Sequence, residues 1–169
     1  AVWSIKEIGG EMWFGTSKGL TIYNKKSGLF TSVFHSDDDA SSLPSNNILS
    51  ILKTKKGEIW IGTTKGLCQL TSRKNGKLSF KNYPLNTTDL LNVQSVIEDK
   101  DGSLWVGTKN KGLLKFDLKE KAFISFLPAE KYREINTDIR SLVIDNQGSL
   151  WVGAYDGIYI LGKDKSLQK

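Results

Sequence analysis

The chain alternates between short apolar segments and clusters of turn residues, and the same order of segments recurs four times. Each copy opens with an apolar segment, at residues 2–8, 48–53, 93–99 and 139–145. A short turn follows, and then a second apolar segment that contains tryptophan. Both segments have apolar residues at adjacent positions, which is typical of strands buried on both faces. The third segment starts at a Gly-Leu or Gly-Ile pair, and the fourth is aromatic and partly polar. The pattern therefore predicts four units of four β-strands, with the first strands buried and the last strands facing solvent.

Four tryptophans mark the copies, with spacings of 47, 45 and 46 residues, each in a Gly-x-x-Trp-x-Gly motif. We interpret each indole as packed between neighbouring sheets, opposite a position that glycine leaves without a side chain. Stacking on a sugar is the alternative use of these rings. A serine that recurs in each first segment is interpreted as a small packing residue, since no base is placed to activate it. The tryptophans and glycines are Trp13, Trp60, Trp105, Trp151, Gly15, Gly62, Gly107 and Gly153, and the serines are Ser4, Ser50, Ser95 and Ser141.

A repeat of about 46 residues with four strands has the size of one β-propeller blade. A β-sandwich would show strict alternation of apolar and polar positions, and one coil of a β-helix is much shorter. We therefore predict an all-β fold, a β-propeller fragment with four blades of antiparallel four-stranded sheets. The blades span residues 1–35, 47–84, 92–127 and 138–169, and the last blade lacks its outer strand.

The third copy carries a family resemblance most clearly. Residues 92–108 are Asn-Val-Gln-Ser-Val-Ile-Glu-Asp-Lys-Asp-Gly-Ser-Leu-Trp-Val-Gly-Thr, and the copy closes at 112–117 with Gly-Leu-Leu-Lys-Phe-Asp. This pattern resembles the two-component regulator propeller repeat. The resemblance implies the periplasmic sensor region of a bacterial hybrid two-component system, with seven-bladed rings, oligosaccharide ligands and a histidine kinase further along the polypeptide. The chain shows no phospho-accepting His motif and no ATP-binding glycine boxes, so we expect no catalytic domain and no catalytic residue in it.

We expect the four blades to form an open arc of a seven-bladed ring, and a closed ring of four blades is the alternative. An open arc exposes two apolar blade faces, which favour association. The expected partners at these faces are the remaining blades of the parent propeller or a second copy of this chain.

Composition excludes several other classes. The net charge is +6, from 24 basic and 18 acidic residues, but the lysines are scattered and only three residues are arginine, which does not favour nucleic-acid binding. One cysteine and one histidine exclude an internal disulfide and disfavour a zinc site, so no metal and no cofactor is expected. No apolar stretch reaches the roughly 18 residues that span a bilayer, so no membrane contact is expected within this chain.

Ligand contacts are expected on the loops between second and third strands and between successive blades, since loops on a rigid scaffold carry function. Several lysines there favour an acidic glycan, and solvated turn residues are the alternative interpretation. Loop residues His35, Asp37, Asp38 and Asp39 lack the alternating oxygen ligands of a calcium loop. The candidate ligand-binding residues are Lys18, Lys65, Lys109, Asn110, Lys111, Arg133, Tyr155 and Asp156.

Two other functions remain open at this stage. A propeller glycosidase or lyase needs two carboxylates across a cleft or a His/Tyr acid–base set. A protein–protein scaffold is the second of these functions. We favour a periplasmic module that senses an oligosaccharide and signals to a kinase absent from this chain.

Overall fold

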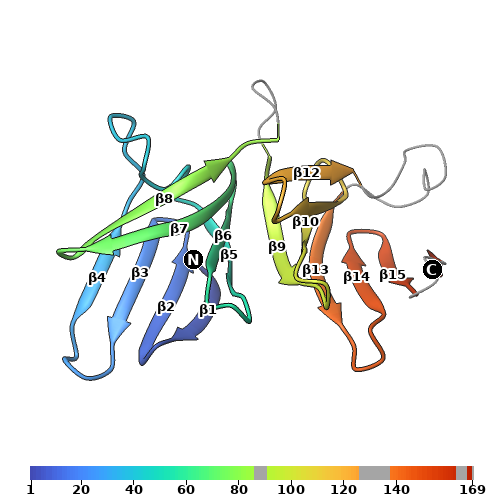
Figure 1. Ribbon diagram of the computed structural model, residues 1–169, viewed down its shortest axis with the longest axis horizontal. Helices are drawn as coiled ribbons and strands as arrows, with labels where there is room; N and C mark the ends of the chain where they lie inside the picture. Colours follow the sequence, from blue (N-terminus) through green and yellow to red (C-terminus); the bar gives the residue numbers. More distant parts are fainter. Residues whose placement is uncertain (86–90, 126–137, 163–166, 169) are drawn as a thin grey trace. The chain divides into compact units, whose positions relative to one another are not determined.

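The structure is a computed structural model that describes residues 1–85, 91–125, 138–162 and 167–168 (Figure 1). These residues form strands joined by turns and loops, and the strands make four antiparallel sheets of four strands each. The chain divides into two compact units, residues 1–91 and 92–169, each with two sheets. Among the residues described, the structure contains no helix with the length and apolar character that crossing a membrane requires.

The first unit holds two sheets in which strands pair in sequence order (Figure 1). The first sheet contains β1 (Val2–Ile8), β2 (Glu11–Thr16), β3 (Gly19–Asn24) and β4 (Phe30–Val33). The second contains β5 (Ile48–Lys53), β6 (Ile59–Thr63), β7 (Gly66–Lys74) and β8 (Lys77–Tyr83). This sequential pairing is the meander predicted for each repeat.

The second unit repeats the same arrangement. Its first sheet contains β9 (Val93–Glu98), β10 (Leu104–Thr108), β11 (Leu113–Asp117) and β12 (Ala122–Ser125). Its second contains β13 (Ile139–Ile144), β14 (Leu150–Ala154), β15 (Gly157–Leu161) and β16 (Leu167–Gln168). The fourth sheet therefore has an outer strand, and the expectation that it lacks one needs correction. This strand has only two residues, which pair with Ile160 and Leu161, so it is too short to be recognised as a strand from its sequence pattern.

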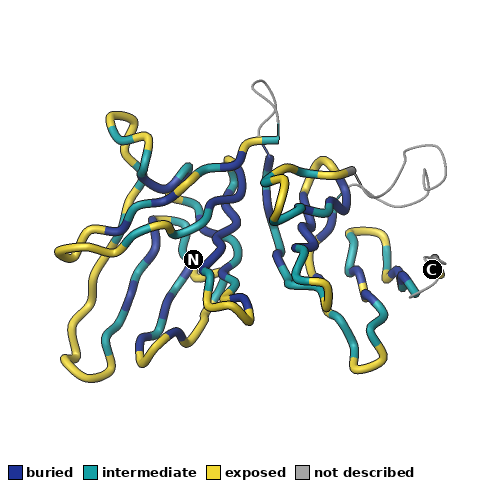
Figure 2. Tube along the Cα trace, viewed as in Figure 1, coloured by how far each residue is buried: buried dark blue, intermediate teal, exposed yellow. Residues whose placement is uncertain are grey.

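Each unit is held together by an apolar layer between its two sheets (Figure 2). In the first unit, Trp13 of β2 packs in one buried cluster with Ile48 and Ile51 of β5. In the second, Trp105 of β10 packs with Ile139 and Leu142 of β13. Every residue of β6 and β10 is buried, which confirms the prediction for these two tryptophan strands, whereas β2 is buried at alternate positions and Trp151 of β14 is exposed.

A β-bulge lies at the same place in the first strand of all four sheets, directly before the recurring serine. That serine lies opposite the glycine of the tryptophan strand, as Ser4 lies opposite Gly15. The bulge adds one residue to the first strand and increases its twist. The sequence interpretation did not foresee it, although apolar positions such as Ile48 and Ile51 are three residues apart instead of two.

The glycine of the tryptophan strand permits a close approach between neighbouring sheets. A Cβ placed on Gly15 would lie 2.9 Å from Cγ2 of Ile48, and one on Gly107 would lie 2.7 Å from Cγ2 of Ile139. Close approach was expected, but the expected partner was an indole. The structure corrects this, because the nearest atoms belong to the first isoleucine of the next sheet.

Candidate functional site: the strand-connecting turns and a pocket in the first unit

The turns between second and third strands are closed by a threonine in three of the four sheets. The hydroxyl of Thr16 donates to the carbonyl of Gly19 at 2.8 Å and accepts the amide N–H of Lys18 at 3.0 Å. Thr63 makes the same pair of bonds with Gly66 and Lys65. Thr108 bonds Gly112 and Lys111 in the same way. The fourth sheet has Ala154 at this position and cannot form these bonds.

Each turn also lies beside the residue that leads into the first strand of its own sheet. Its backbone N–H donates to that residue's carbonyl, as Thr64 does to Asn47 at 3.2 Å and Tyr155 does to Asp138 at 2.9 Å. The turns and the lead-in loops therefore share one end of every sheet. This is the geometry on which the sequence interpretation based its choice of ligand-binding residues.

The structure places the candidate residues in four separate turns. Lys18 and Lys65 are exposed in two turns of the first unit, while the other described candidates are exposed in two turns of the second unit. Tyr155 has 76% of its surface exposed, and the carboxylate of Asp156 accepts a bond of 2.6 Å from the hydroxyl of buried Tyr159. Arg133 lies outside the described residues. The second-unit turns hold Lys109, Asn110 and Lys111 in one case and Tyr155 and Asp156 in the other.

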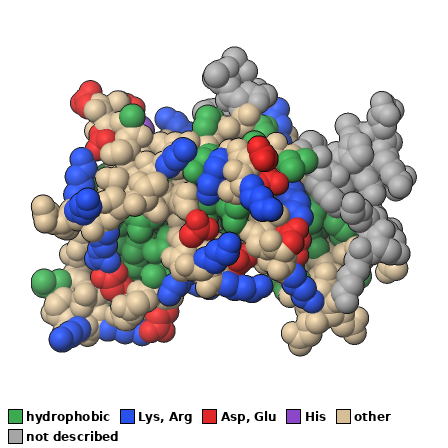
Figure 3. Space-filling model, viewed as in Figure 1, with side chains coloured by type: hydrophobic (Ala, Val, Ile, Leu, Met, Phe, Trp, Pro, Cys, Tyr) green, Lys and Arg blue, Asp and Glu red, His purple; other side chains and the backbone are tan. Residues whose placement is uncertain are grey.

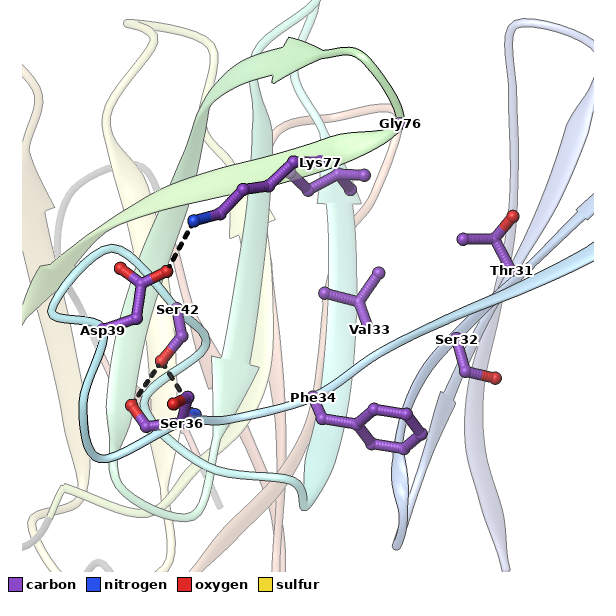
Figure 4. A pocket seen from close by; sticks show the side chains of 10 residues that line it. Thr31, Ser32, Val33, Phe34, Ser36, Asp39, Ser42, Gly76 and Lys77 are labelled. Atoms are coloured by element: carbon purple, nitrogen blue, oxygen red, sulfur yellow. Dashed lines mark hydrogen bonds and ion pairs between the residues drawn. The ribbon is translucent and has the colours of Figure 1, made fainter.

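A pocket of about 240 Å³ opens in the first unit, between the outer strand of its first sheet and the β7–β8 turn (Figure 4). Residues 31–34 of β4 and its end form one wall, and Gly76, Lys77 and Leu78 form the opposite wall. The loop after β4 contributes residues 36, 39 and 42. The pocket therefore combines hydroxyl groups, a carboxylate, an ammonium group and apolar side chains.

Asp39 supplies the negative charge of this pocket. Its Oδ2 lies 2.9 Å from the ammonium group of Lys77, and its Oδ1 accepts bonds from the hydroxyl and the backbone N–H of Ser41. The Ser41 hydroxyl bond and then the Lys77 ammonium group lower the pKa of Asp39 to about 2. The carboxylate is therefore ionised at neutral pH, and Lys77 remains 69% exposed with further donors facing solvent.

The loop that carries Asp39 is fixed by its own bonds. The hydroxyl of Ser42 accepts the Ser36 N–H at 3.0 Å and donates to the Ser36 carbonyl at 2.9 Å. Leu43 is fully buried in the core of the unit, and Nδ1 of His35 lies 2.6 Å from its carbonyl oxygen. The pocket wall is thus preformed, which lowers the entropy cost of binding a ligand.

Sequence reasoning missed most of this pocket. It noted Asp39 as a loop residue, but Thr31, Ser32, Phe34 and Lys77 were not considered together because they are far apart in the chain. One feature of the sequence could have indicated the pocket: the loop at residues 35–47 is longer than the connection at residues 84–92.

Acidic residues hold the indole N–H groups of three tryptophans. Trp105 donates to Asp99 and Trp151 donates to Asp145, both at 2.9 Å, while Trp13 donates to Glu11 at 3.1 Å. Asp99 and Asp145 also accept backbone N–H groups in the turns, so each carboxylate joins a turn to an indole. Because Trp13 and Trp105 are buried, they pack between sheets and are closed to a sugar in solution.

Glu11 also links the two sheets of the first unit. Arg73 of β7 donates two bonds to its carboxylate, at 2.7 and 2.9 Å. These bonds are the main cause that lowers the pKa of Glu11 below its ordinary value. Among the residues described, no group of three or more His, Cys, Asp and Glu side chains lies close enough to hold a metal ion.

Comparison with known proteins identifies the repeat. The model of the family "two component regulator propeller" matches residues 42–65, 89–110 and 134–156, each a stretch with a tryptophan motif. These three stretches are similar to two-component regulator propeller repeats. The matches fall on the second, third and fourth copies and end within the turns between their second and third strands. A search of curated protein sequences found no match.

Solved structures of similar fold extend the comparison over nearly the whole chain. The extracellular domain of the putative hybrid two component system BT4673 from B. thetaiotaomicron is 28% identical, with a TM-score of 0.81 over 99% of this chain and 22% of its own. The corresponding domain of BT3049 from the same organism is 20% identical, with a TM-score of 0.81 over 99% and 23%. The present chain thus spans about a fifth of the length of these domains, and its fold is that of a β-propeller.

Virginiamycin B lyase from Staphylococcus aureus is also similar in fold. It is 14% identical, with a TM-score of 0.67 over 99% of this chain and 54% of its own. At this identity the likeness shows the fold alone and carries no information about the chemistry of this chain.

Proposed function

We propose that this chain is part of the ligand-sensing propeller of a bacterial two-component signalling protein. The observation that carries the proposal is the 28% identity over 99% of the chain to the extracellular domain of a putative hybrid two component system. The three matches to the regulator propeller repeat support it independently. In this proposal the chain is periplasmic, binds without catalysing a reaction, and passes the signal to a histidine kinase that lies elsewhere in the polypeptide.

The proposed ligand is an oligosaccharide, and the pocket of the first unit has suitable groups for one. Carbohydrate hydroxyls need hydrogen-bond donors and acceptors at fixed positions. Lys77 and the hydroxyls of Thr31 and Ser32 provide donors, while the ionised carboxylate of Asp39 provides acceptors. Val33 and Leu78 add apolar surface for the carbon face of a sugar ring.

The exposed turn residues of each unit form a further candidate surface on that unit. Lys18, Lys65, Lys109 and Lys111 would add positive charge and attract an acidic oligosaccharide from a distance. Such an attraction weakens as salt is added, because exposed charges are screened over about 10 Å at 0.1 M. Binding held within the pocket depends less on salt, since its hydrogen bonds are short-range.

The proposal is tested by titrating the chain with neutral and acidic oligosaccharides in a calorimeter. We expect saturable binding that Asp39→Asn weakens by at least about tenfold, since one good hydrogen-bonding charge contributes more than about 1.4 kcal/mol. Asp117→Asn is the matched control, because Asp117 accepts turn N–H groups in the second unit and lies outside the pocket. Equal affinities for both variants would remove the pocket from the proposal.

The same samples separate binding from catalysis. Sugars recovered after incubation are analysed for shorter or unsaturated products. Turnover would replace the sensor proposal with an enzyme, while unchanged sugars together with saturable binding support it.

A further inference from the structure

The pocket of the first unit has the size of one sugar residue rather than of a whole oligosaccharide. Its volume is about 240 Å³, whereas pockets that enclose a drug-sized ligand measure about 300–1,000 Å³. All ten residues that line it belong to the first unit, between its two sheets and the loop after β4. The pocket therefore contacts one residue of a longer ligand, and its chemistry decides which kind of residue that is.

Lys77 reaches this pocket because the hairpin of β7 and β8 is unusually long. β7 has nine residues, whereas the third strands of the other sheets have five or six. Asn75 and Gly76 form the turn, with positive φ angles of 51° and 78°. Two such residues make the compact turn that matches the twist of a hairpin. The backbone of Lys77 is thus held in place directly after this turn, at the wall opposite β4 (Figure 4).

The charged groups of the pocket have more hydrogen-bond donors left for a ligand than acceptors. A carboxylate offers about four lone-pair sites, and Asp39 uses three of them for the hydroxyl and N–H of Ser41 and the ammonium group of Lys77. An ammonium group has about three N–H donors. Among the described residues, Asp39 is the partner that the structure shows for the Lys77 ammonium group. About two donors of Lys77 thus remain, against about one acceptor site of Asp39.

The charges of this pair favour an anionic ligand group over a cationic one. A cationic amino sugar at Asp39 would be repelled by Lys77, and it would find one free lone pair at most. An anion bonded to the ammonium group lies closer to that group than to the carboxylate of Asp39. Because Coulomb energy falls with distance, its attraction to Lys77 exceeds its repulsion from Asp39. A neutral sugar hydroxyl would form a weaker bond with Lys77, since only one of the two partners is charged.

A broad basic surface does not account for such a preference. On the face shown in Figure 3, Lys and Arg side chains lie among acidic and neutral ones. Exposed charges of both signs are screened over about 10 Å at 0.1 M salt, so scattered lysines discriminate poorly between an acidic sugar and its neutral form. Discrimination needs a direct contact, and the Lys77 ammonium group provides one at the pocket.

We propose that Lys77 makes the pocket selective for an acidic sugar residue, one that carries a carboxylate or a sulfate group, by donating its remaining N–H groups to that anion. This selectivity rests on the proposed function, because it names the ligand chemistry of the same pocket. Asp39 keeps the ammonium group at the wall and accepts a sugar hydroxyl. Lys77 is then the residue that determines specificity, and the hairpin that places it occurs in the second copy of the repeat.

The test compares each acidic sugar with its own neutral form. Trigalacturonate and its carboxyl-reduced counterpart form one pair, and a sulfated galactose trisaccharide and its desulfated counterpart form the other. Calorimetric titration gives both dissociation constants of a pair, and their ratio measures the preference for the anion. A folding defect weakens both members of a pair alike, so it leaves this ratio unchanged. The pair that shows the preference identifies the anion as carboxylate or sulfate.

In the wild-type chain, the acidic member of at least one pair should bind at least about tenfold more tightly, as expected for one hydrogen bond between charged groups. Lys77→Gln should abolish this preference and leave neutral binding in place, because glutamine keeps N–H donors but has no charge. Lys77→Arg should keep the preference. Lys74→Gln is the matched control, since Lys74 lies directly opposite Lys77 in the same turn, is exposed and is not among the residues that line the pocket.

The possible results separate the role of Lys77 from the proposed function. Equal binding of both members in each pair, or a preference that persists in Lys77→Gln, would overturn the role of Lys77 while the chain still binds sugar. Loss of the preference in Lys74→Gln as well would assign it to the total charge of the hairpin and would also overturn that role. If none of the four sugars binds saturably, the sensor proposal fails, and the selectivity proposed for its pocket fails with it.

Discussion

The link between Glu11 and Arg73 allows the contribution of one inter-sheet contact to be measured. The side chain of Glu11 is 10% exposed and that of Arg73 is 45% exposed, and two bonds of 2.7 and 2.9 Å join them. Breaking a fully buried ion pair costs about 3–5 kcal/mol, and an exposed pair contributes about 0–1 kcal/mol. Because one partner is buried and the other half exposed, we expect Glu11→Gln to cost about 2 kcal/mol. The variant keeps one acceptor oxygen but loses the charge and the two-point contact with the guanidinium group.

Native-state hydrogen exchange is the appropriate assay, since a chain of two units need not unfold in a single step. Protection of amides in β2 and β6 should fall about thirtyfold in Glu11→Gln, which corresponds to about 2 kcal/mol. Amides of β10 in the second unit serve as the internal reference. Glu58→Gln is the matched control, because Glu58 holds the same repeat position but bonds the neutral side chain of Gln69. It should cost less than about 1 kcal/mol.

The pH dependence of stability gives an independent check that the ionised carboxylate of Glu11 stabilises the first unit. Because the folded state lowers the pKa of Glu11, this carboxylate stabilises the unit above its unfolded pKa of about 4.3. That stability is lost as the pH falls through the folded pKa, and Glu11→Gln should flatten this loss. A double-mutant cycle with Arg73→Met should give a coupling of at least about 1 kcal/mol. A coupling near zero would refute the reasoning, since it would mean that the pair behaves as an exposed one.

Three further predictions concern the repeat itself. Gly107→Ala should destabilise the second unit by about 1–3 kcal/mol, because the added methyl group overpacks the contact with Ile139. Ile139→Ala in the same chain should relieve that cost, and thermal unfolding of the single and double variants is the measurement. Thr63→Val should cost about 1–2 kcal/mol in urea unfolding because two buried bonds of its turn are lost, whereas Ala154→Thr should stabilise the fourth sheet by up to about 1 kcal/mol. Burial raises the pKa of the Cys68 thiol, so it should react with a thiol reagent only after unfolding, and rapid reaction of the native chain would contradict its position in the core.

The sequence predicts the parts of the fold that occur once in every repeat. Strands, turns and the positions of the tryptophans could be located because four copies place the same residue types at the same spacing. Each copy meets the same packing requirement, so chance patterns are averaged out. The threonine that closes three of the turns follows this rule, because it comes directly after the second glycine of the motif in the first three copies.

Features that occur only once were not predictable in the same way. Arg73 reaches Glu11 across 62 residues, and nothing in the pattern near either residue indicates this contact. The pocket depends on Leu43, which anchors a long loop in the core and thereby holds Asp39 near Lys77. Such contacts follow from the tertiary arrangement of two sheets, which local periodicity does not specify.

This contrast also ranks the candidate ligand residues. A lysine precedes the turn glycine in the first three copies, at Lys18, Lys65 and Lys111, so its recurrence follows from the turn that every copy forms. Tyr155 and the loop that contains Asp39 do not recur in the other copies, and the packing of the sheets does not require either of them. A binding surface has to distinguish one ligand from others, and positions that are identical in every blade cannot provide a distinct arrangement. Recognition by this chain should therefore depend on the places where its copies differ.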